Sequence, residues 1–503
     1  MAFSRREFLK LGSLAAVATT ATGCSTIGRQ IAANDLPETL AVPTAVSTTV
    51  AAQTSVAWRL LNRAAYGPRP GDLDRVTKMG AEGWLEEQLH PEQIEDTAVD
   101  LMIRGLTLYH MDASQLIEQE PADGARELIG ATIVRALYSN RQLYETMVEF
   151  WSDHFNIYLR KVKTMPLLKI LDDRDVIRPY ALGKFGDLLR ASVHSPAMLV
   201  YLDNVRNNKS HPNENYAREL MELHTLGVHA GYTQADVQEL ARVLTGWTMR
   251  HRGRRVGEVV LNREQHDFGE KRFLGHVLPA GRGVEEIEEV IQILLAHPAT
   301  AEFIATKLVR RFVADEPPAS LVSRVADTFR QTDGDIKSML RVIFLSEEFA
   351  TAPPKLKRPF TYMISALRAL HADLRPARGL GEWLELLGQL PFHWPPPNGY
   401  PDVSPAWATN LLPRWNFALA LLHNELPGVN VPFDKILTAT DTRNSVRLVH
   451  LFAQLVLGRP LDTTAAQLLQ DYVGTGEVTD SHIQERLRDA IALMIASPAF
   501  QWT

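Results

Sequence analysis

The way this chain folds is indicated most clearly by the stretch Asn213-Glu214-Asn215-Tyr216-Ala217-Arg218-Glu219-Leu220-Met221-Glu222-Leu223-His224-Thr225-Leu226-Gly227. Asn213 is a good N-cap residue, and Gly227 suits the left-handed position that ends many helices. Tyr216, Leu220 and Leu223 recur at helical spacing and mark one apolar face. The pattern predicts an amphipathic helix of about three to four turns.

The same periodicity continues through most of the chain. The exception is a region at about 249–284, where Val256, Val259 and Leu261 alternate as in a short β-hairpin. The sequence therefore predicts a mainly α, multi-helix globular body with one small β-hairpin or irregular excursion. Helical apolar spacing is found in four further stretches, residues 55–64, 71–89, 125–158 and 285–349.

The length of the chain, 503 residues, exceeds what one hydrophobic core usually serves. The clearest internal linker is Ala352-Pro353-Pro354. We therefore expect a helical core domain over 54–350 and a C-terminal helical subdomain over 351–503, which carries a Pro- and aromatic-rich loop.

The first residues have the pattern of an export signal. Ser4-Arg5-Arg6-Glu7-Phe8-Leu9-Lys10 fits the twin-arginine motif, with Arg5 and Arg6 as its arginine pair, and a short stretch of small apolar residues follows. Cys24, the only cysteine, closes a stretch that resembles a lipoprotein processing site. We expect a signal over 1–24, a lipid anchor on Cys24 and a flexible tether over 25–53.

Composition excludes several classes of protein. The formal net charge of −6 gives no support for nucleic-acid binding. The single cysteine allows no internal disulfide and no Cys-based metal site. No apolar run after the signal is long enough to cross a membrane.

Three segments concentrate polar residues of catalytic type, and the first is Glu149-Phe150-Trp151-Ser152-Asp153-His154-Phe155-Asn156. On a helix, Glu149, Asp153 and Asn156 form one polar stripe beside an aromatic face. We name Asp153 and Asn156 as candidate binding residues and His154 as a candidate proton carrier. The alternative is an ordinary amphipathic helix with a solvated face and a hydrogen-bonded histidine.

The second segment is the helix after Asn213. Glu219 and Glu222 are spaced so that both carboxylates point the same way, which suits acid–base work or hard-metal ligation. We name them as candidate catalytic residues, with Asn213 as a binding residue and His224 as a metal ligand. The alternative for Glu219 is an ion pair with a nearby arginine.

The third segment, 232–247, begins with Thr233 and Asp236, which fit a capping box. Candidate binding residues in this segment are Glu239, Arg242 and Trp247, although Glu239 and Arg242 can simply pair with each other. Downstream, the adjacent residues His266 and Asp267 are candidate ligands for a divalent metal.

The aromatic loop at 391–402 leaves two interpretations open. Trp394, Tyr400 and the following Trp407 can line a carbohydrate-type site, or they can pack the C-terminal unit onto the core. Packing is favoured because aromatic side chains more often serve burial.

Taken in order, these motifs resemble those of the bacterial DUF1800 proteins, and the resemblance runs from about Val56 to the C-terminus. The family implies a large exported protein, often with a twin-arginine signal and often encoded beside DUF1501 proteins, which look like alkaline-phosphatase or sulfatase relatives. The family brings no established catalytic residues. The segments that carry the resemblance are Arg59-Leu60-Leu61-Asn62-Arg63-Ala64-Ala65-Tyr66-Gly67-Pro68, Phe150 to Phe155, Asn213 to Gly227, Leu244-Thr245-Gly246-Trp247 and His266-Asp267.

Two functions follow as hypotheses. The first is an exported hydrolase, metal-assisted or not, acting on an extracytoplasmic polymer or glycan. The second is a non-catalytic surface lipoprotein that scaffolds or assists a partner enzyme such as a DUF1501-type protein.

Overall fold

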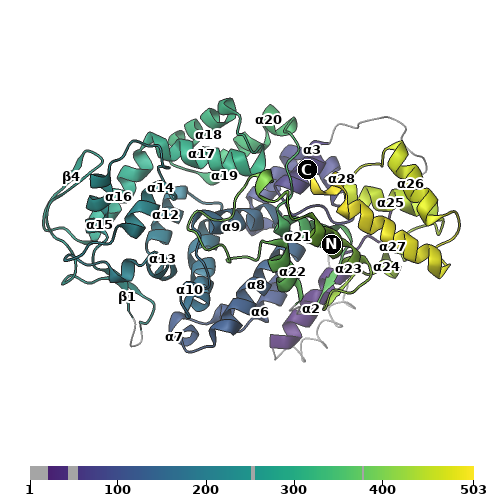
Figure 1. Cartoon of the computed structure of the whole chain (residues 1–503), viewed down its shortest axis with the longest axis horizontal. Helices are drawn as coiled ribbons and strands as arrows, with labels where there is room; N and C mark the ends of the chain where they lie inside the picture. The colour runs from purple at the N-terminus through teal and green to yellow at the C-terminus, as the bar shows by residue number, and fades with distance from the viewer. Residues whose placement is uncertain (1–20, 43–54, 251–254, 376–378) are drawn as a thin grey trace.

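Helices make up most of the structure, a computed structural model that describes residues 21–42, 55–250, 255–375 and 379–503 (Figure 1). The predicted mainly α fold is confirmed. The helices are α2 (Ala21–Ala33), α3 (Val56–Arg63), α4 (Asp72–Met79), α5 (Ala81–Leu89), η1 (Pro91–Gln93), α6 (Thr97–Arg104), η2 (Leu108–His110), α7 (Ala113–Leu116), α8 (Pro121–Tyr138), α9 (Gln142–His154), α10 (Met165–Leu171), η3 (Asp172–Ile177), α11 (Arg178–Tyr180), α12 (Phe185–Val193), α13 (Pro196–Tyr201), η4 (Asn204–Arg206), α14 (Glu214–Glu222), α15 (Gln234–Val243), α16 (Val284–Ala296), α17 (Pro298–Phe312), α18 (Ala319–Gln331), α19 (Ile336–Phe344), α20 (Glu347–Ala350), α21 (Pro359–Ala369), α22 (Gly379–Leu387), η5 (Ser404–Ala406), α23 (Leu411–Leu422), α24 (Phe433–Thr438), α25 (Ser445–Leu457), α26 (Thr463–Val473), α27 (Ser481–Ala496) and α28 (Pro498–Gln501).

The β structure consists of short antiparallel pairs. Strand β1 (Trp247–Met249) pairs with β2 (Val259–Leu261), and β3 (Lys271–Phe273) pairs with β4 (His276–Leu278). This confirms small hairpins in the predicted region, although Val256 lies in a turn and not in a strand. A third pair joins β5 (Asp373–Leu374) to β6 (Val429–Asn430).

The stretch from Asn213 to Gly227 begins as predicted and ends its helix earlier. Asn213 caps α14 through its side-chain oxygen, which accepts from the backbone N–H of Asn215 at 2.9 Å. The helix ends at Glu222 because the Thr225 hydroxyl donates a hydrogen bond to the Leu220 carbonyl at 2.7 Å. Side-chain hydrogen bonds of this kind compete with the backbone hydrogen bonds of the helix. Gly227 follows with a φ of 78°. The helix is therefore shorter than predicted.

The hydrophobic residues form two large clusters, and they do not divide at residue 350. The first contains α9 and most elements from α12 to α20. The second contains α21 to α28 together with α2, α6 and α8 from the N-terminal part of the chain. The predicted C-terminal subdomain thus has a core that earlier helices complete. In Figure 1 the α15–α16 end and the α25–α26 end lie at opposite extremes, with α9 and α21 between them.

The segment predicted as a flexible tether is in part an ordered helix. Helix α2 packs against α6, and Arg29 pairs with Asp373 at 3.1 Å. Leu40 is buried beyond it and donates its backbone N–H to Ala439 at 2.8 Å. The tether prediction is therefore wrong for residues 25–42, because Ala32, Leu40 and Val42 are buried in the second hydrophobic cluster. The rest of that segment, 43–53, lies outside the described residues.

The predicted linker at residues 352–354 is followed by backbone pairing with the last residues of the chain. The backbone N–H of Lys355 donates to Thr503 at 2.8 Å, and that of Lys357 donates to Gln501 at 2.8 Å. This pairing fixes the start of α21 beside α3, whose Arg63 also donates to the Thr503 carbonyl.

Within the described residues, helices long and apolar enough to span a membrane are absent. Cys24 lies in the first half of α2 and is half-buried.

Candidate functional site

The polar stripe of α9 is buried between the two hydrophobic clusters. The aromatic side chains of the same helix, Phe150 and Trp151, lie in the first cluster, as the sequence predicts. The opposite face carries Glu149 and Asp153, whose side chains keep only 12% and 18% of their exposure. The stripe is therefore not the solvated face of an ordinary amphipathic helix.

Two arginines from distant parts of the chain meet these carboxylates. Arg311, in the last turn of α17, binds Glu149 at 2.9 Å and Asp402 at 2.9 Å. Arg358, directly before α21, binds Asp402 at 3.0 Å and also pairs with Asp153. We call these five residues the central cluster.

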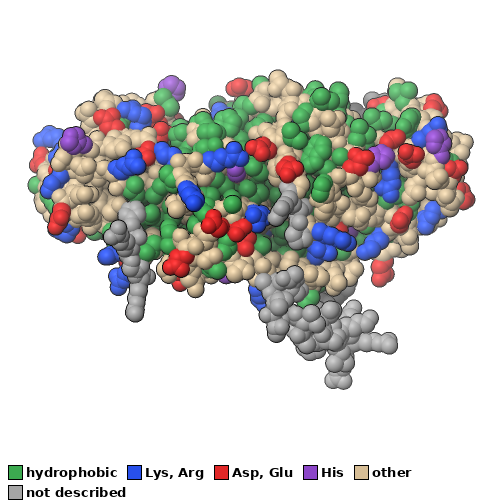
Figure 2. All heavy atoms as spheres, turned by 60° about the horizontal axis from the view of Figure 1, so that its bottom comes forward, with side chains coloured by type: hydrophobic (Ala, Val, Ile, Leu, Met, Phe, Trp, Pro, Cys, Tyr) green, Lys and Arg blue, Asp and Glu red, His purple; other side chains and the backbone are tan. Residues whose placement is uncertain are grey.

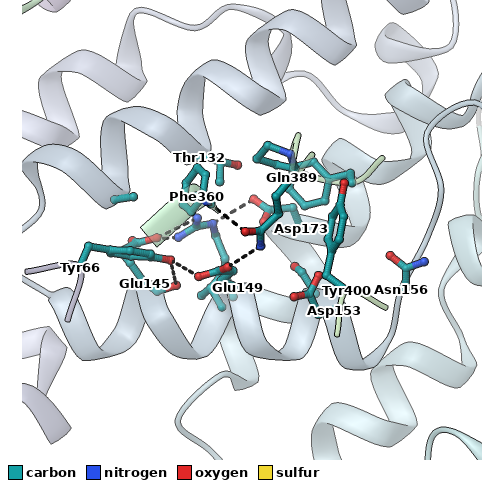
Figure 3. Close-up of a pocket in the computed structure, with 16 residues that line it drawn as sticks. Tyr66, Thr132, Glu145, Glu149, Asp153, Asn156, Asp173, Phe360, Gln389 and Tyr400 are labelled. Carbon is teal, nitrogen blue, oxygen red and sulfur yellow. Dashed lines mark hydrogen bonds and ion pairs between the residues drawn. The ribbon is translucent and has the colours of Figure 1, made fainter. Parts of the chain in front are cut away.

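Tyr66 and Gln389 complete the polar contacts of Glu149. The Tyr66 hydroxyl donates to Glu149 Oε2 at 2.8 Å, and the Gln389 side-chain amide reaches Glu149 Oε1 at 3.5 Å. Figure 3 shows the two side chains reaching Glu149 from different sides, with Asp153, Asn156 and Tyr400 at the other end of the pocket. Burial, followed by the nearby Glu149 charge, raises the pKa of Tyr66, which keeps its hydroxyl a donor.

The two aspartates of the central cluster differ in protonation. Burial raises the pKa of Asp153 to about 6, with Arg358 opposing this effect and Glu149 reinforcing it. Burial acts on Asp402 as well, but Arg311, Arg358 and Lys355 outweigh it and hold the pKa of that carboxyl below its ordinary value. Asp153 thus exchanges a proton near neutral pH, and Asp402 does not.

A cavity of about 40 Å³ lies beside the cluster and is bordered by a second set of buried charges. Arg178 binds Glu145 at 3.0 Å and Asp173 at 2.9 Å. Asp173 belongs to η3, a π-helical turn, and such turns are often found at functional sites. The cavity holds water-sized groups.

The Pro- and aromatic-rich loop closes the cavity. Asn156 donates its side-chain N–H groups to the carbonyls of Trp394 at 2.9 Å and Pro396 at 2.7 Å. Gly399, with a φ of 72°, lies against the Asp153 carbonyl so closely that a Cβ atom would collide with it. Tyr400 and Trp407 are buried and pack together with Leu356, so the packing interpretation of this loop holds for both.

A family model described as "Protein of unknown function (DUF1800)" matches residues 59–502. The chain belongs to the DUF1800 family. Neither the curated proteins nor the solved structures gave a match.

Two DUF1800 motifs meet at the central cluster. The segment from Arg59 to Pro68 supplies Tyr66, and the segment from Phe150 to Phe155 supplies Asp153. Glu149 belongs to the polar stripe predicted from the sequence, whereas Arg311, Arg358 and Asp402 were not predicted as site residues. Asp402 lies in the aromatic loop that the sequence singles out. The two arginines carry no local signal, because nothing in the sequence distinguishes them from other arginines at helix ends.

His154 lies behind the cluster with both ring nitrogens engaged. Its Nε2 is 3.1 Å from the His224 carbonyl, and its Nδ1 is 2.9 Å from the Lys307 ammonium. Burial, then the charge of Lys307, lowers the pKa of His154 far below its ordinary value. Burial also lowers the pKa of Lys307 to about 8 and that of His224 to about 3. His154 is thus a neutral, hydrogen-bonded histidine, which was the alternative to a proton carrier.

Glu219 and Glu222 lie on α14, away from the central cluster contacts. Glu222 pairs with Arg218 at 3.4 Å, and Arg218 also reaches Glu214 at 3.2 Å. Glu219 is half-buried, and burial followed by repulsion from Glu222 raises its pKa. Asn213 serves as the helix cap. Their predicted catalytic and binding roles stay predictions.

The remaining candidates form a third environment beside the hairpins. Arg242 binds Asp267 at 2.7 Å and Glu239 at 2.9 Å. His266 is fully buried, with Nδ1 donating to the Thr245 carbonyl at 2.7 Å and Nε2 facing Glu286 at 3.4 Å. Trp247 is buried in β1. Ion pairing therefore accounts for Glu239, Arg242 and Asp267, and the capping box predicted at Thr233 and Asp236 is confirmed.

The predicted metal ligands do not come together. His224 lies near His154, whereas His266 and Asp267 contact Thr245 and Arg242. In the described part of the chain, no group of three or more His, Cys, Asp or Glu side chains is placed to hold a metal ion. The residues present do not fit the divalent metal that the sequence suggested.

Proposed function

We propose that this protein is an exported hydrolase of an extracytoplasmic polymer or glycan, with Glu149 and Asp153 as its acid–base pair. The supporting observation is Asp153, a carboxyl with a pKa of about 6 at the wall of a cavity. A group that titrates near the working pH is the best general acid or base. The paired carboxylates Glu219 and Glu222 do not line this cavity.

The two carboxyl groups have different roles in this proposal. Glu149 accepts hydrogen bonds from Tyr66 and Arg311, which fix its orientation. As the glycosidic bond breaks, Asp153 gives its proton to the leaving oxygen. Glu149 takes a proton from the attacking water, whose oxygen bonds to the anomeric carbon, and exchange with solvent then restores the proton on Asp153. Pairs of carboxyls with separated pKa values carry out glycoside hydrolysis in this way.

Substrate access in this proposal requires the loop from Pro391 to Asp402 to lift. The cavity of about 40 Å³ admits no sugar ring while the loop is in place. Two side-chain hydrogen bonds from Asn156 and one from Tyr201 hold the loop. We assign Asn156 the role of holding the loop closed through these two hydrogen bonds.

The direct test is a screen of the purified, exported protein for release of reducing ends from soluble polysaccharides. Asp153→Asn and Glu149→Gln are each expected to lower the rate by about 100-fold or more. The control is Asp123→Asn, an exposed aspartate on α8 paired only with Arg126. Full activity in both carboxyl variants would refute the assignment.

Export and anchoring belong to the same proposal. Arg5 and Arg6 lie outside the described residues, so these roles rest on the sequence. Arg5→Lys with Arg6→Lys is expected to retain the protein in the cytoplasm, and Cys24→Ser to release it from membranes. Since α2 is fixed to the body, a lipid on Cys24 would hold the body close to the membrane surface.

A second candidate function, a non-catalytic lipoprotein that assists a DUF1501-type partner, is favoured by one surface. Figure 2 shows hydrophobic side chains gathered near the middle of one face of the molecule. Leu412, Trp415 and Leu419 on α23 and Leu386 on α22 are exposed at 64%, 48%, 43% and 62%. Several exposed apolar side chains on neighbouring helices often mark a protein-binding site.

The partner hypothesis is tested by co-purification of the two proteins from cells that express both. Trp415→Ser with Leu412→Ser is expected to abolish recovery of the partner. Leu468→Ser on α26, an equally exposed leucine, serves as the control. Recovery that does not change in the double variant would contradict a docking role for α23.

A further inference from the structure

A cleft of about 430 Å³ lies beside α4 and α5, about ten times the volume of the central cavity. This size falls within the range of small-molecule sites, about 300–1,000 Å³. We call it the α4–α5 cleft. It begins where the Arg59–Pro68 motif ends, since Arg69, Gly71 and Asp72 line it while Tyr66 lines the central cavity.

The floor of the cleft presents two buried guanidinium groups. Arg69 donates to the Tyr138 and Ser139 carbonyls, the second at 3.0 Å, but its buried Nε has no hydrogen-bond partner. Arg368 donates to the Gly67 carbonyl at 2.7 Å and pairs with Asp72 at 3.3 Å. Burial, then repulsion from Arg69, lowers the pKa of Arg368 to about 9. Both guanidinium groups thus line the cleft and are already held by backbone carbonyls.

The lining of the cleft also contains paired donors and acceptors. Arg75 pairs with Glu87 across an exposed contact, and Arg69 pairs with Asp35 at 3.1 Å. Gln93 and Asn140 also line the cleft. Opposite charges on the lining are nearly balanced, so the cleft exerts little net attraction on an ion.

We propose that the α4–α5 cleft binds a neutral, hydroxyl-rich ligand, a sugar unit of a glycan. A hydroxyl both donates and accepts hydrogen bonds, so a sugar matches a lining that holds both guanidinium donors and carboxylate acceptors. This binding extends the proposed function to a second site and does not depend on catalysis at Asp153.

The test measures binding of cellobiose, xylobiose, mannobiose, maltose and N,N′-diacetylchitobiose by titration calorimetry, with galacturonate and glutamate as charged probes. At least one neutral disaccharide is expected to bind with a Kd of about 1 mM or tighter. Arg75→Gln, which removes a rim donor, is expected to weaken it about five- to tenfold. Gln93→Trp, which fills the mouth without removing a buried contact, is expected to abolish it.

Two controls separate this site from the central cluster. Arg126→Gln removes an exposed arginine of a similar ion pair on α8 and is expected to leave binding unchanged. Asp153→Asn is also expected to bind the sugar normally, even where it abolishes hydrolysis. Absence of binding for every neutral probe, tighter binding of galacturonate or glutamate, or binding unaffected by both cleft variants would each overturn the proposal.

Discussion

The protonation of Asp153 makes the stability of the protein depend on pH in a defined direction. Its pKa of about 6 in the folded protein exceeds the ordinary value of 3.8. The folded state therefore binds the proton more tightly, and this group lowers the free energy of unfolding as pH rises from about 4 through about 6. Relative to the wild type, Asp153→Asn is expected to gain up to about 3 kcal/mol between pH 4 and pH 7.

Urea unfolding of both proteins across that range measures this difference. For Asp123→Asn, an exposed control, the free energy of unfolding should differ from that of the wild type by the same amount at every pH. A constant difference between Asp153→Asn and the wild type would show that Asp153 has an ordinary pKa.

Gly399 fixes the loop to the site by the absence of a side chain. Its φ of 72° disfavours any other residue, and a Cβ atom would strike the Asp153 carbonyl. Gly399→Ala is expected to cost at least about 2 kcal/mol and to free the loop, seen as a change in Trp394 fluorescence. Gly474→Ala is the matched control, because its φ of 83° gives the same strain with nothing within 4 Å of a Cβ atom. Equal losses in the two variants would contradict a close contact at Gly399.

At the scale of single elements, α9 shows what a sequence can and cannot predict. The spacing of Glu149, Asp153 and Asn156 predicts their common face. The pattern does not predict whether water or another part of the chain covers that face, since this depends on Arg311 and Arg358, which lie more than a hundred residues away in the sequence. Local pattern predicts helices and caps well, and it does not predict their partners.

Helix α2 is a second element whose packing partner the sequence does not predict. Its segment has few charged residues, as a flexible linker does. Gly28 lets it approach α6, where a Cβ atom would meet the Ala98 carbonyl. Gly28→Leu is expected to separate α2 from α6 and to accelerate tryptic cleavage after Arg29, which now pairs with Asp373. Gly130→Ala, in an open position on α8, is the control and should stabilise by up to about 1 kcal/mol. Unchanged cleavage in Gly28→Leu would mean that α2 does not depend on this contact.

At the scale of the whole molecule, the central cluster joins the two hydrophobic clusters. Glu149 and Asp153 belong to α9 in the first, whereas Arg358 leads into α21 in the second. The predicted boundary near residue 350 stays a prediction, although residues after it belong mainly to the second cluster. It misses that α2, α6 and α8 complete the second core, because sequence order does not show which amphipathic faces meet. A two-domain interpretation therefore understates how strongly the halves depend on each other.

This dependence predicts the effect of Arg358→Gln. Arg358 keeps 4% of its side-chain exposure, and its loss leaves Asp153 and Asp402 with one guanidinium fewer. Removing one partner from a buried charge network costs about 3–5 kcal/mol. The loss should be smaller at pH 5, where Asp153 is protonated, and the double variant with Asp153→Asn should lose less than the sum of the two single variants.

The control for this prediction is Arg341→Gln, which breaks the half-exposed pair with Glu86 and should cost about 1 kcal/mol or less. If the central cluster couples the halves, the wild type unfolds in one transition. In Arg358→Gln the α21–α28 half should then lose its structure at a lower urea concentration than the α9–α20 half, as followed by hydrogen exchange. A single unshifted transition in that variant would mean that apolar packing alone joins the two cores. The charge balance around Asp153 would then have to be explained by chemistry rather than by assembly.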